Sequence, residues 1–345
     1  MPLIISILSD QLIPTVLFIR QMARPGDHHI FLTTDEMENK QKSVTLAETL
    51  KLRDNQFEVI SVNPNKPNAI LDILKKCKWP KAEKFIVNIT GGTKMMSQAV
   101  FMFFSQQESA EIYYWPIGVN VMEQLHPELK EITIEYPVQL DLKTYFMAHG
   151  YDYNGSATLH QSKEKTDELF RKVVGAGSAE KVLEILQAKR EDYLRPDKQY
   201  YLGGWFEEWL YNFLKTKLNL KAHQIGLNMK LKSRKSVRRT ESDNEIDIAF
   251  VYNNKLFFWE CKVYYTRSAT GKKIGEAVYK VSSLRNTLGL QATSFVALMV
   301  PFGNNAARKN YLKDLSQLMQ VKKVFSLEDM RDKERFLKNI EEYLI

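Results

Sequence analysis

Cysteine is scarce in this chain of 345 residues: Cys77 and Cys261 are its only two. We therefore expect neither a disulfide framework nor a cysteine cluster that binds zinc, and a reducing compartment suits the chain. No apolar run is long enough to cross a bilayer. The first residues, MPLIISILSD, lack the basic start and cleavage site of a signal peptide and instead predict a buried strand. These absences favour a cytoplasmic protein with no membrane partner.

The first part of the chain has no net positive charge, and the last part is strongly basic. Residues 1–150 carry 15 Lys and Arg against 17 Asp and Glu, and residues 151–195 carry 8 of each. Residues 196–345 carry 26 against 16. A basic domain indicates a phosphate-rich partner such as a nucleic acid, although a solubilising surface would have the same charge.

Two familiar glycine signatures are absent from residues 1–150. No G-x-G-x-x-G fingerprint follows the first strand, and the segment TGGTK lacks the P-loop spacing. Short apolar runs alternate instead with helical periodicity, which predicts an α/β fold with a Rossmann-like, doubly wound parallel sheet. We expect strands at Leu3–Leu8, His29–Thr33, Phe57–Val62, Phe85–Ile89 and Glu111–Trp115. We expect helices at Pro14–Met22, Ser43–Leu52 and Pro67–Cys77, and another after Thr93.

The segment Thr90–Lys94 joins the fourth expected strand to the helix that follows it. Its glycines let the backbone approach a ligand closely, and the helix N-terminus and Lys94 favour an anion. Doubly wound folds bind ligands at this carboxyl edge of the sheet. The alternative is an ordinary glycine-rich turn with a helix cap. The candidate ligand-binding residues are Ser9, Asp10, Gln11, Thr34, Asp35, Thr90, Gly91, Gly92, Thr93, Lys94, Met95, Pro116, Ile117, Gly118 and Asn120.

The middle of the chain, residues 151–195, reads as a linker with one helix. The stretch from about Asp152 to Lys165 is polar, and a helix is expected over Ala179–Arg190. Residues 196–345 predict an α+β domain with a mixed sheet. Its expected elements are a helix at Gly204–Leu214, strands at Glu245–Tyr252, Lys255–Val263 and Thr293–Val300, a hairpin turn at Asn253–Asn254 and a helix at Lys273–Asn286.

Three charged residues stand on the apolar hairpin of this last part. Because side chains alternate along a strand, Glu260 and Lys262 share one face, and Cys261 points away. Asp247 lies on the preceding apolar strand, where a lone charge is costly. Two carboxylates can hold Mg²⁺ or Mn²⁺, which activates water, and the lysine can position that water or stabilise a phosphoryl oxygen. The constellation predicts a metal-dependent nuclease; the alternative is a salt bridge of Lys262 with a neighbouring carboxylate.

Flanking residues could complete such a site. On the GGWFEEWLYNFLK helix, Glu207 lies beside the apolar stripe and could reach a metal-bound water, or could lie at the surface. Glu208 lies nearly opposite the stripe and should be solvated. Tyr264 and Tyr265 could stack on bases or simply pack. Cations expected to contact the nucleic-acid backbone are Lys280 and Arg285 on the helix, and Lys230, Lys232, Arg234, Lys235, Arg238 and Arg239 in a loop before Asp247 that is otherwise a solvated hairpin.

Both halves of the chain resemble one family. The segments Ser9–Gln11, Thr34–Met37, Asn88–Met95 and Pro116–Gly118 resemble a CARF domain, the CRISPR-associated Rossmann-like sensor. The segments Gly203–Glu208, Asn244–Asp247, Trp259–Lys262 and Ala277–Lys280 resemble the fused PD-(D/E)XK nuclease domain, which is restriction-endonuclease-like. Their order along the chain, together with the GGWFEE helix, makes the resemblance specific.

The resemblance implies a homodimeric effector of type III CRISPR antiviral defence. A cyclic oligoadenylate, usually cyclic tetra-adenylate, would bind across the two-fold axis between CARF domains and activate cleavage of DNA, RNA or both with Mn²⁺ or Mg²⁺. By position, Asp247 and Glu260 would be metal ligands, Lys262 the catalytic lysine, and Thr90–Lys94 the activator's contacts. A two-fold ligand suits an isologous dimer. The remaining alternatives are a ligand-responsive nucleic-acid binder without turnover and an ungated restriction or repair nuclease.

Overall fold

The computed structural model divides into two compact units. The first comprises Met1–Leu140 and Thr144–Tyr151, and the second comprises Asp141–Lys143 and Asp152–Ile345. The structure describes residues 2–79, 83–116, 118–135, 137–154, 158–176, 180–181, 184–185, 203–234, 245–264, 271–289, 291–299 and 306–344. Among the helices of these residues, none combines the length and the apolarity that a bilayer crossing requires.

The first unit is built on one sheet with the strand order β3-β2-β1-β4-β5-β6-β7. The parallel strands are β1 (Leu3–Ile7), β2 (His28–Thr33), β3 (Phe57–Ser61), β4 (Phe85–Asn88) and β5 (Ala110–Tyr114). Two antiparallel strands follow, β6 (Val121–His126) and β7 (Lys130–Thr133). The predicted parallel sheet is thus confirmed, and the antiparallel pair was missed because its strands are half exposed and only weakly apolar.

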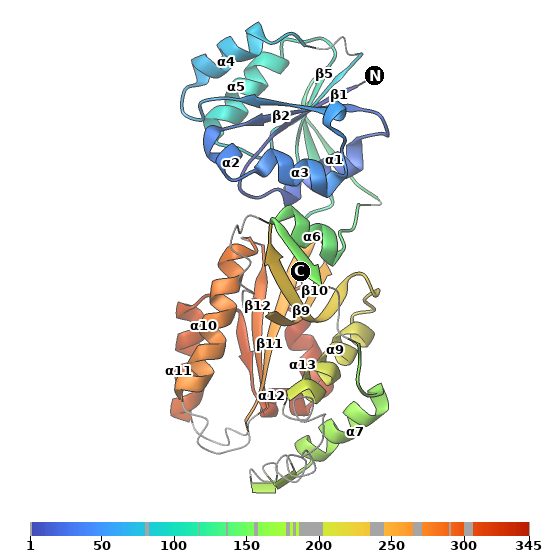
Figure 1. Ribbon diagram of the computed structural model, residues 1–345, viewed down its shortest axis with the longest axis vertical. Helices are drawn as coiled ribbons and strands as arrows, with labels where there is room; N and C mark the ends of the chain where they lie inside the picture. The colour runs from blue at the N-terminus through green and yellow to red at the C-terminus, as the bar shows by residue number, and fades with distance from the viewer. Residues whose placement is uncertain are drawn as a thin grey trace. The chain divides into compact units, whose positions relative to one another are not determined.

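Helices cover both faces of this sheet, as the strand–helix alternation predicts (Figure 1). On one side lie α1 (Ile13–Met22), α2 (Asp35–Asn39) and α3 (Lys42–Leu50), and on the other lie α4 (Pro67–Lys76) and α5 (Lys94–Phe104). A 3₁₀ turn, Asp54–Gln56, precedes β3, and the first unit also includes most of α6 (Leu142–Ala148), from Thr144 onward. The central strands are continuously apolar because both faces of the sheet are buried under helices. Ile5, Val87 and Ile112, for example, are fully buried.

The second unit contains a mixed sheet with the order β13-β12-β11-β10-β9-β8. Its strands are β8 (Tyr151–Asn154), β9 (Ile225–Ser233), β10 (Glu245–Tyr252), β11 (Lys255–Val263), β12 (Thr293–Met299) and β13 (Lys323–Phe325). Strands β9, β10 and β11 are antiparallel, whereas β11, β12 and β13 are parallel. Asn253 and Asn254 form the predicted hairpin turn with φ values of 49° and 60°, which is the left-handed geometry that asparagine tolerates.

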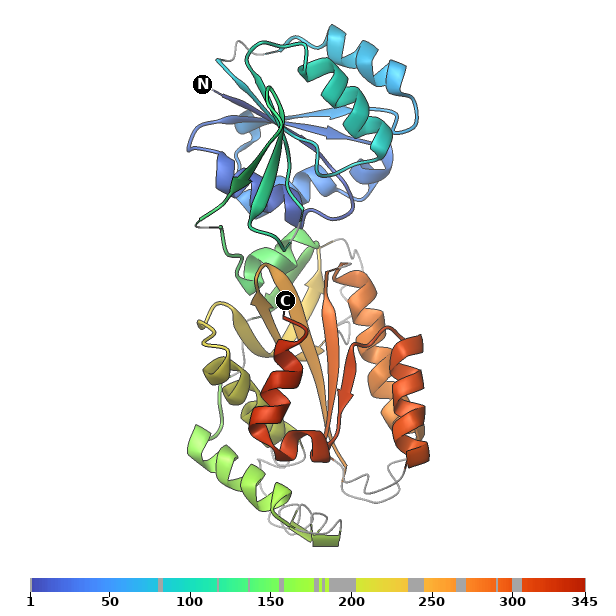
Figure 2. The ribbon, with the colours of Figure 1, turned by 180° about the vertical axis from the view of Figure 1, so that it is seen from behind.

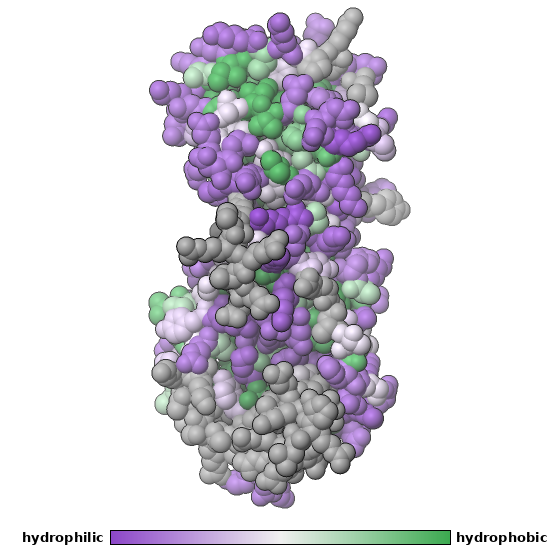
Figure 3. Space-filling view, in the orientation of Figure 1, coloured by the Kyte–Doolittle hydropathy of each residue, from purple (hydrophilic) through white to green (hydrophobic). Residues whose placement is uncertain are grey.

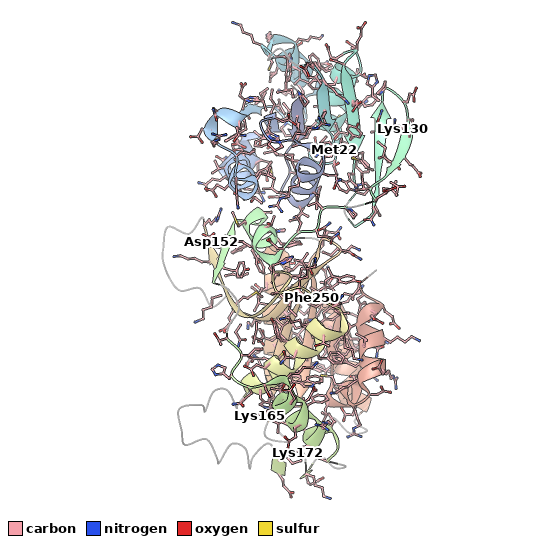
Figure 4. The ribbon with its side chains drawn as sticks, turned by 90° about the vertical axis from the view of Figure 1, so that its right-hand side faces the viewer. Met22, Lys130, Asp152, Lys165, Lys172 and Phe250 are labelled. Atoms are coloured by element: carbon pink, nitrogen blue, oxygen red, sulfur yellow. The ribbon has the colours of Figure 1, made fainter. Side chains whose placement is uncertain are left out.

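Aromatic packing holds the second unit together. The predicted stripe of α9 (Trp205–Lys217) is buried against the sheet, where Phe250 and Trp259 belong to the same core (Figure 4 labels Phe250). Helices α12 (Leu327–Arg331) and α13 (Lys333–Glu341) complete that side, as Figure 2 shows from behind. Helices α10 (Gly271–Thr287) and α11 (Ala306–Leu318) lie on the opposite side of the sheet. Each face of β11 therefore has its own helical cover.

Part of the predicted linker is regular structure. Residues 151–154 form β8, and Lys163–Val174 forms α7, whose Phe170 and Val173 are buried in the core of the second unit. The Phe170 ring stacks on Trp209 at a centroid distance of 3.5 Å. The polar sequence concealed this packing because only one face of α7 is apolar. Of the helix predicted over Ala179–Arg190, most lies outside the described residues.

Candidate active site

Asp247 and Glu260 stand on neighbouring antiparallel strands, β10 and β11. The register pairs Ile248 with Trp259, which brings the two acidic residues face to face at the end of the paired segment. There the Asp247 carboxylate accepts the backbone N–H of Cys261 at 2.7 Å, in place of a ladder bond. Asp247 is 6% exposed and Glu260 1%. Two nearly buried carboxyl groups therefore share one small volume on the sheet.

Two lysines neutralise this acidic pair. Lys262 Nζ lies 2.6 Å from Glu260 Oε1 and 4.0 Å from Asp247 Oδ2. Lys280 Nζ, from α10, lies 2.6 Å from Glu260 Oε2 and 3.9 Å from Asp247 Oδ1. Strand alternation accounts for the first contact, since Glu260 and Lys262 share the face turned toward α10 while Cys261 enters the aromatic core. The three predicted residues Asp247, Glu260 and Lys262 thus converge in the structure.

Burial controls the electrostatics of the cluster. The pKa of Asp247 is raised to about 8, chiefly by burial and also by the nearby Glu260 and Glu207 carboxylates, against the opposing effect of Lys262 and Lys280. Burial lowers the pKa of Lys262, but the Asp247 and Glu260 carboxylates outweigh it, so that this pKa lies above its ordinary value. The site therefore holds a cationic lysine beside a carboxyl group that retains its proton near neutral pH.

Glu207 and Glu208 are adjacent on α9, and Glu208 is more deeply buried than predicted. Glu207 is half-buried, and burial raises its pKa while the Asn228 side chain, hydrogen-bonded to it, and Lys262 lower it. Glu208 was expected in solvent, which is wrong: it is 2% exposed and accepts the backbone N–H groups of His160 and Gln161. The segment before α7 folds over this carboxylate, and periodicity along α9 alone cannot reveal such a cover.

Asn228 is a site residue that the sequence analysis missed. It lies within β9, where the register of β9 with β10 places it opposite Asp247, and its φ of 48° is left-handed. Such a backbone inside a strand is uncommon and marks a locally constrained position. Its amide bonds to Glu207 and so ties that carboxylate to the sheet. The signal in the sequence is one asparagine in the apolar run Ile225–Leu231.

The cations predicted to contact nucleic acid have different surroundings. Lys280 is held by Glu260, and the Arg285 guanidinium donates to Ala292 O at 3.1 Å and to Gln320 Oε1 at 2.6 Å. Arg234 pairs with Asp152 at 2.6 Å. Lys230 and Lys232 belong to strand β9 rather than to a loop. Tyr264 is half-buried, and the residues outside the described part of the chain are Lys235, Arg238, Arg239 and Tyr265.

The donor set fits a hard divalent cation only in part. Carboxylate oxygens of Asp247 and Glu260 are the ligands that Mg²⁺ and Mn²⁺ prefer. A cation between them would also relieve the repulsion from Glu260, which adds to the effect of burial in raising the pKa of Asp247. Within the described ranges, however, no group of three or more His, Cys, Asp and Glu side chains is arranged to hold a metal. Asp247 and Glu260 would thus be the protein ligands, and other oxygens would have to complete the coordination.

The carboxyl edge of the first sheet collects the other predicted residues. Gly91 and Gly92 lie against β1: a Cβ on Gly91 would come within 2.3 Å of the Ile7 carbonyl oxygen, and one on Gly92 within 2.3 Å of the Ile7 side chain. Gly92 also has a φ of +79°. Glycine is therefore required at both positions, because the turn between β4 and α5 passes directly over the end of β1.

Hydroxyl groups at this edge hold the turns in place. Thr93 caps α5 by accepting the Met96 N–H and donates to Pro64 O at 2.9 Å, while Thr34 caps α2. Thr90 accepts the Trp115 N–H at 2.9 Å, which fixes the end of β5 beside β4. Lys94 and Met95 are exposed at the start of α5. The edge thus presents a helix N-terminus and an exposed ammonium on a rigid backbone.

Ion pairs surround Asp10, which follows β1 at this edge. Lys40 Nζ lies 2.7 Å from Asp10 Oδ2, and Lys42 donates to Asp10 O at 2.6 Å. Burial raises the pKa of Asp10, but the two lysines outweigh it and lower this pKa overall. Lys40 and Lys42 were not among the predicted residues, although the sequence KQK after Asn39 signals local positive charge.

The remaining predicted residues of this edge differ in how exposed they are to solvent. Ser9 and Gln11 are half-buried after β1, and Asp35 accepts the Ser61 hydroxyl at 2.6 Å. Pro116 is half-buried, Gly118 and Asn120 are exposed, and Ile117 lies outside the described residues.

Comparison with protein families agrees with the two units. Residues 3–145 match the model of the Card1 CARF domain, and residues 196–317 match that of the Card1-like endonuclease domain. The chain therefore combines a CARF domain with a Card1-like endonuclease domain. Its CARF domain contains the glycine turn at Gly91–Gly92, and its endonuclease domain contains Asp247, Glu260, Lys262 and Lys280. No curated protein matches the chain.

Solved structures share the fold of the chain. One is Can2 from Sulfobacillus thermosulfidooxidans in complex with cyclic tetra-adenylate, with a TM-score of 0.70 and 21% identity over 98% of this chain and 99% of that one. Another is the protein VC1899 from Vibrio cholerae, with a TM-score of 0.74 and 16% identity over 99% and 98%. A type III CRISPR defence DNA nuclease activated by cyclic oligoadenylate has a TM-score of 0.57 and 16% identity over 88% of this chain and 47% of that one.

Proposed function

We propose that this CARF-domain endonuclease is a metal-dependent phosphodiester hydrolase of type III CRISPR defence, activated by cyclic tetra-adenylate. The observation that carries the proposal is that the Asp247 and Glu260 carboxylates both lie within 4.0 Å of the Lys262 ammonium, in a domain that matches an endonuclease model. Similar folds occur in Can2 bound to cyclic tetra-adenylate and in a type III CRISPR nuclease activated by cyclic oligoadenylate.

The chain's own residues define the chemistry. Asp247 and Glu260 would hold Mn²⁺ or Mg²⁺, which supplies an activated water and a counter-charge for the phosphoryl group. Lys262, cationic and on the same face as Glu260, would stabilise a phosphoryl oxygen or orient the water. Glu207, whose pKa is raised chiefly by burial, is suited to hold or accept a proton during the reaction. The aromatic core beneath Glu260 excludes water from one side of the site.

The activator would bind at the carboxyl edge of the CARF sheet. Gly91 and Gly92 let the backbone approach a ligand, and the N-terminus of α5 with Lys94 favours its phosphates. A cyclic tetra-adenylate has two-fold symmetry and therefore fits between two copies of this edge. Apolar atoms gather over α5, where Met95 and Met102 are 40% and 47% exposed (Figure 3). This exposed face supports a homodimer. Light scattering of the wild type and of Met102→Glu tests it: the wild type should be dimeric and the variant monomeric.

One cleavage assay tests the proposal. Labelled DNA and RNA are incubated with the full chain, with and without cyclic tetra-adenylate and Mn²⁺. Cleavage that requires both additions supports the proposed function. Cleavage that ignores the activator would instead identify an ungated nuclease.

A second candidate function has an observation in its favour. The Glu260 carboxylate is neutralised on both oxygens by Lys262 and Lys280, as expected of a structural ion-pair cluster. The chain would then bind nucleic acid in response to a ligand without hydrolysing it. Tight nucleic-acid binding with no cleavage in Mn²⁺ or Mg²⁺ would select this function over the first.

A further inference from the structure

Lys280 occupies a position that the proposed chemistry does not explain. Its ammonium reaches from α10 to Glu260 Oε2 at 2.6 Å, while Lys262 takes Oε1 at the same distance. Both lysines also lie about 4 Å from Asp247. Each of the four carboxylate oxygens of Asp247 and Glu260 thus has an ammonium group within 4.0 Å. Asp247 Oδ2 accepts a backbone N–H as well.

A divalent ion would compete for the same oxygens. Magnesium and manganese bind carboxylate oxygens at roughly 2.0–2.2 Å, so an ion shared by Asp247 and Glu260 must lie in the space between these oxygens. Two ammonium groups already face that space. Like charges a few ångströms apart repel strongly at a nearly buried site. An ion can therefore enter only if at least one ammonium moves away.

Lys280 is the lysine that is able to leave. Lys262 is on β11, one pleat from Glu260, and β11 is held between β10 and β12, so the backbone of Lys262 is fixed beside the carboxylate. The Lys280 side chain is 33% exposed and that of Lys262 is 41% exposed, so exposure does not separate the two lysines. What separates them is that Lys280 reaches the site from a separate helix, α10. Rotation of its long side chain takes its charge into water without moving the sheet.

We propose that Lys280 is the internal counter-ion of Glu260, which holds the carboxylate in place in the metal-free protein and gives way when the divalent ion binds. The inference rests on the proposed metal-dependent function. It makes Lys280 a positioning residue that competes with the metal, rather than a metal ligand or a fixed contact to the nucleic-acid backbone. Removal of its charge should therefore weaken the metal-free protein and strengthen metal binding.

Metal binding without nucleic acid or activator tests this exchange. Full-length wild type and Lys280→Met are freed of metal with a chelator and titrated with Mn²⁺ by calorimetry, and melting temperatures are measured in parallel. Lys280→Met should melt lower without metal and bind Mn²⁺ with a dissociation constant smaller by about three- to tenfold, because a competing conformation has been removed. Lys313→Met, an exposed lysine of α11, is the matched control and should behave as wild type.

Each other outcome is decisive. Equal or weaker Mn²⁺ binding by Lys280→Met overturns the exchange while leaving the proposed nuclease function intact. If wild type binds no Mn²⁺, both the metal-dependent function and the exchange fail. Should Lys280→Met not fold, Lys280→Gln keeps a donor to Glu260 without the charge, and it too must bind Mn²⁺ more tightly than wild type.

Discussion

The chain contains two candidate phosphate sites built in opposite ways. The CARF edge uses backbone: Gly91 and Gly92 allow close approach, Thr93 caps α5, and Lys94 is exposed. The endonuclease site uses buried side-chain charge, with Asp247 and Glu260 almost inaccessible and matched by two lysines. Backbone amides and an exposed lysine suit reversible recognition of an anion's shape. Buried charges are held in fixed positions at low dielectric, which suits chemistry.

The difference has an energetic consequence. At the CARF edge, the loss of one side chain leaves the other hydrogen-bond donors in place and in contact with solvent. The affinity for an anion should therefore be reduced rather than abolished. In the endonuclease site, the loss of one partner leaves a buried charge without compensation, which costs about 3–5 kcal/mol of stability when the burial is complete. Substitutions should therefore separate the two sites clearly.

The largest effect is expected from Glu260→Gln. It removes one of the two carboxylates that would bind the metal and leaves Lys262 and Lys280 without their shared partner. Activated cleavage should fall by roughly 10³-fold or more. Binding of cyclic tetra-adenylate, measured by calorimetry, should be unchanged.

Glu341→Gln is the matched control for that substitution, because Glu341 is an exposed acid of α13. It should cleave as wild type does. Wild-type cleavage by Glu260→Gln would show that the assigned acidic pair is not the catalytic one.

A second large effect is expected from Gly91→Ala in the CARF domain. Its Cβ would clash with the Ile7 carbonyl oxygen at 2.3 Å, so the turn between β4 and α5 must move. Overpacking of this kind costs about 1–3 kcal/mol. Affinity for cyclic tetra-adenylate should drop by about tenfold or more, measured by calorimetry. Mn²⁺ binding by the endonuclease domain should be unaffected; a parallel loss there would mean that the two sites are not independently built.

The adjacent acids of α9 allow a sharper comparison within one helix. Glu208→Ala leaves the His160 and Gln161 N–H groups without their acceptor, and it should destabilise the protein by about 1–3 kcal/mol. Glu207→Gln keeps the size and the contact to Asn228, so stability should hold while the cleavage rate falls by about tenfold.

Thermal melting and single-turnover cleavage of the two variants measure the split. If Glu207→Gln proved the less stable variant and Glu208→Ala the slower one, the assignment of the two acids would be reversed.

The smallest effect expected is a pH dependence that comes from Asp247. Its pKa rises from 3.8 to about 8 on folding, so the folded metal-free protein binds one more proton in that range. The stability linked to that proton is complete below about pH 4 and is lost as the pH rises through 8. The melting temperature of chelator-treated wild type should therefore fall relative to Asp247→Asn between pH 5 and 8, by on the order of 2–4 °C. A constant difference across that range would mean that Asp247 ionises normally.

Strand alternation and helix periodicity predicted much of this molecule. The apolar strands of both units, the Asn253–Asn254 turn and the buried stripe of α9 follow from local pattern, because each depends on side chains that are near in sequence. The shared face of Glu260 and Lys262 follows in the same way. The antiparallel strands β6 and β7 did not, since they are half exposed and carry little apolar signal.

Local sequence patterns could not predict contacts between segments that are distant in the sequence. Glu208 is covered by residues 160–161, Arg285 turns to Gln320, and Lys280 turns to Glu260. Each contact joins residues that are 20 or more positions apart, so no periodicity encodes it. The bond of Asn228 to Glu207 belongs to the same class.

By itself, the sequence determined the apolar strands, the buried stripe of α9 and the acidic pair with its lysine on an apolar hairpin, because these depend on which residue types alternate along a strand or helix. Only the tertiary structure decided how the charges are balanced: it turned Lys280 toward Glu260, buried Glu208 and set Asn228 opposite Asp247. The physical reason is that charge compensation acts through space, and folding determines which distant groups share one low-dielectric volume.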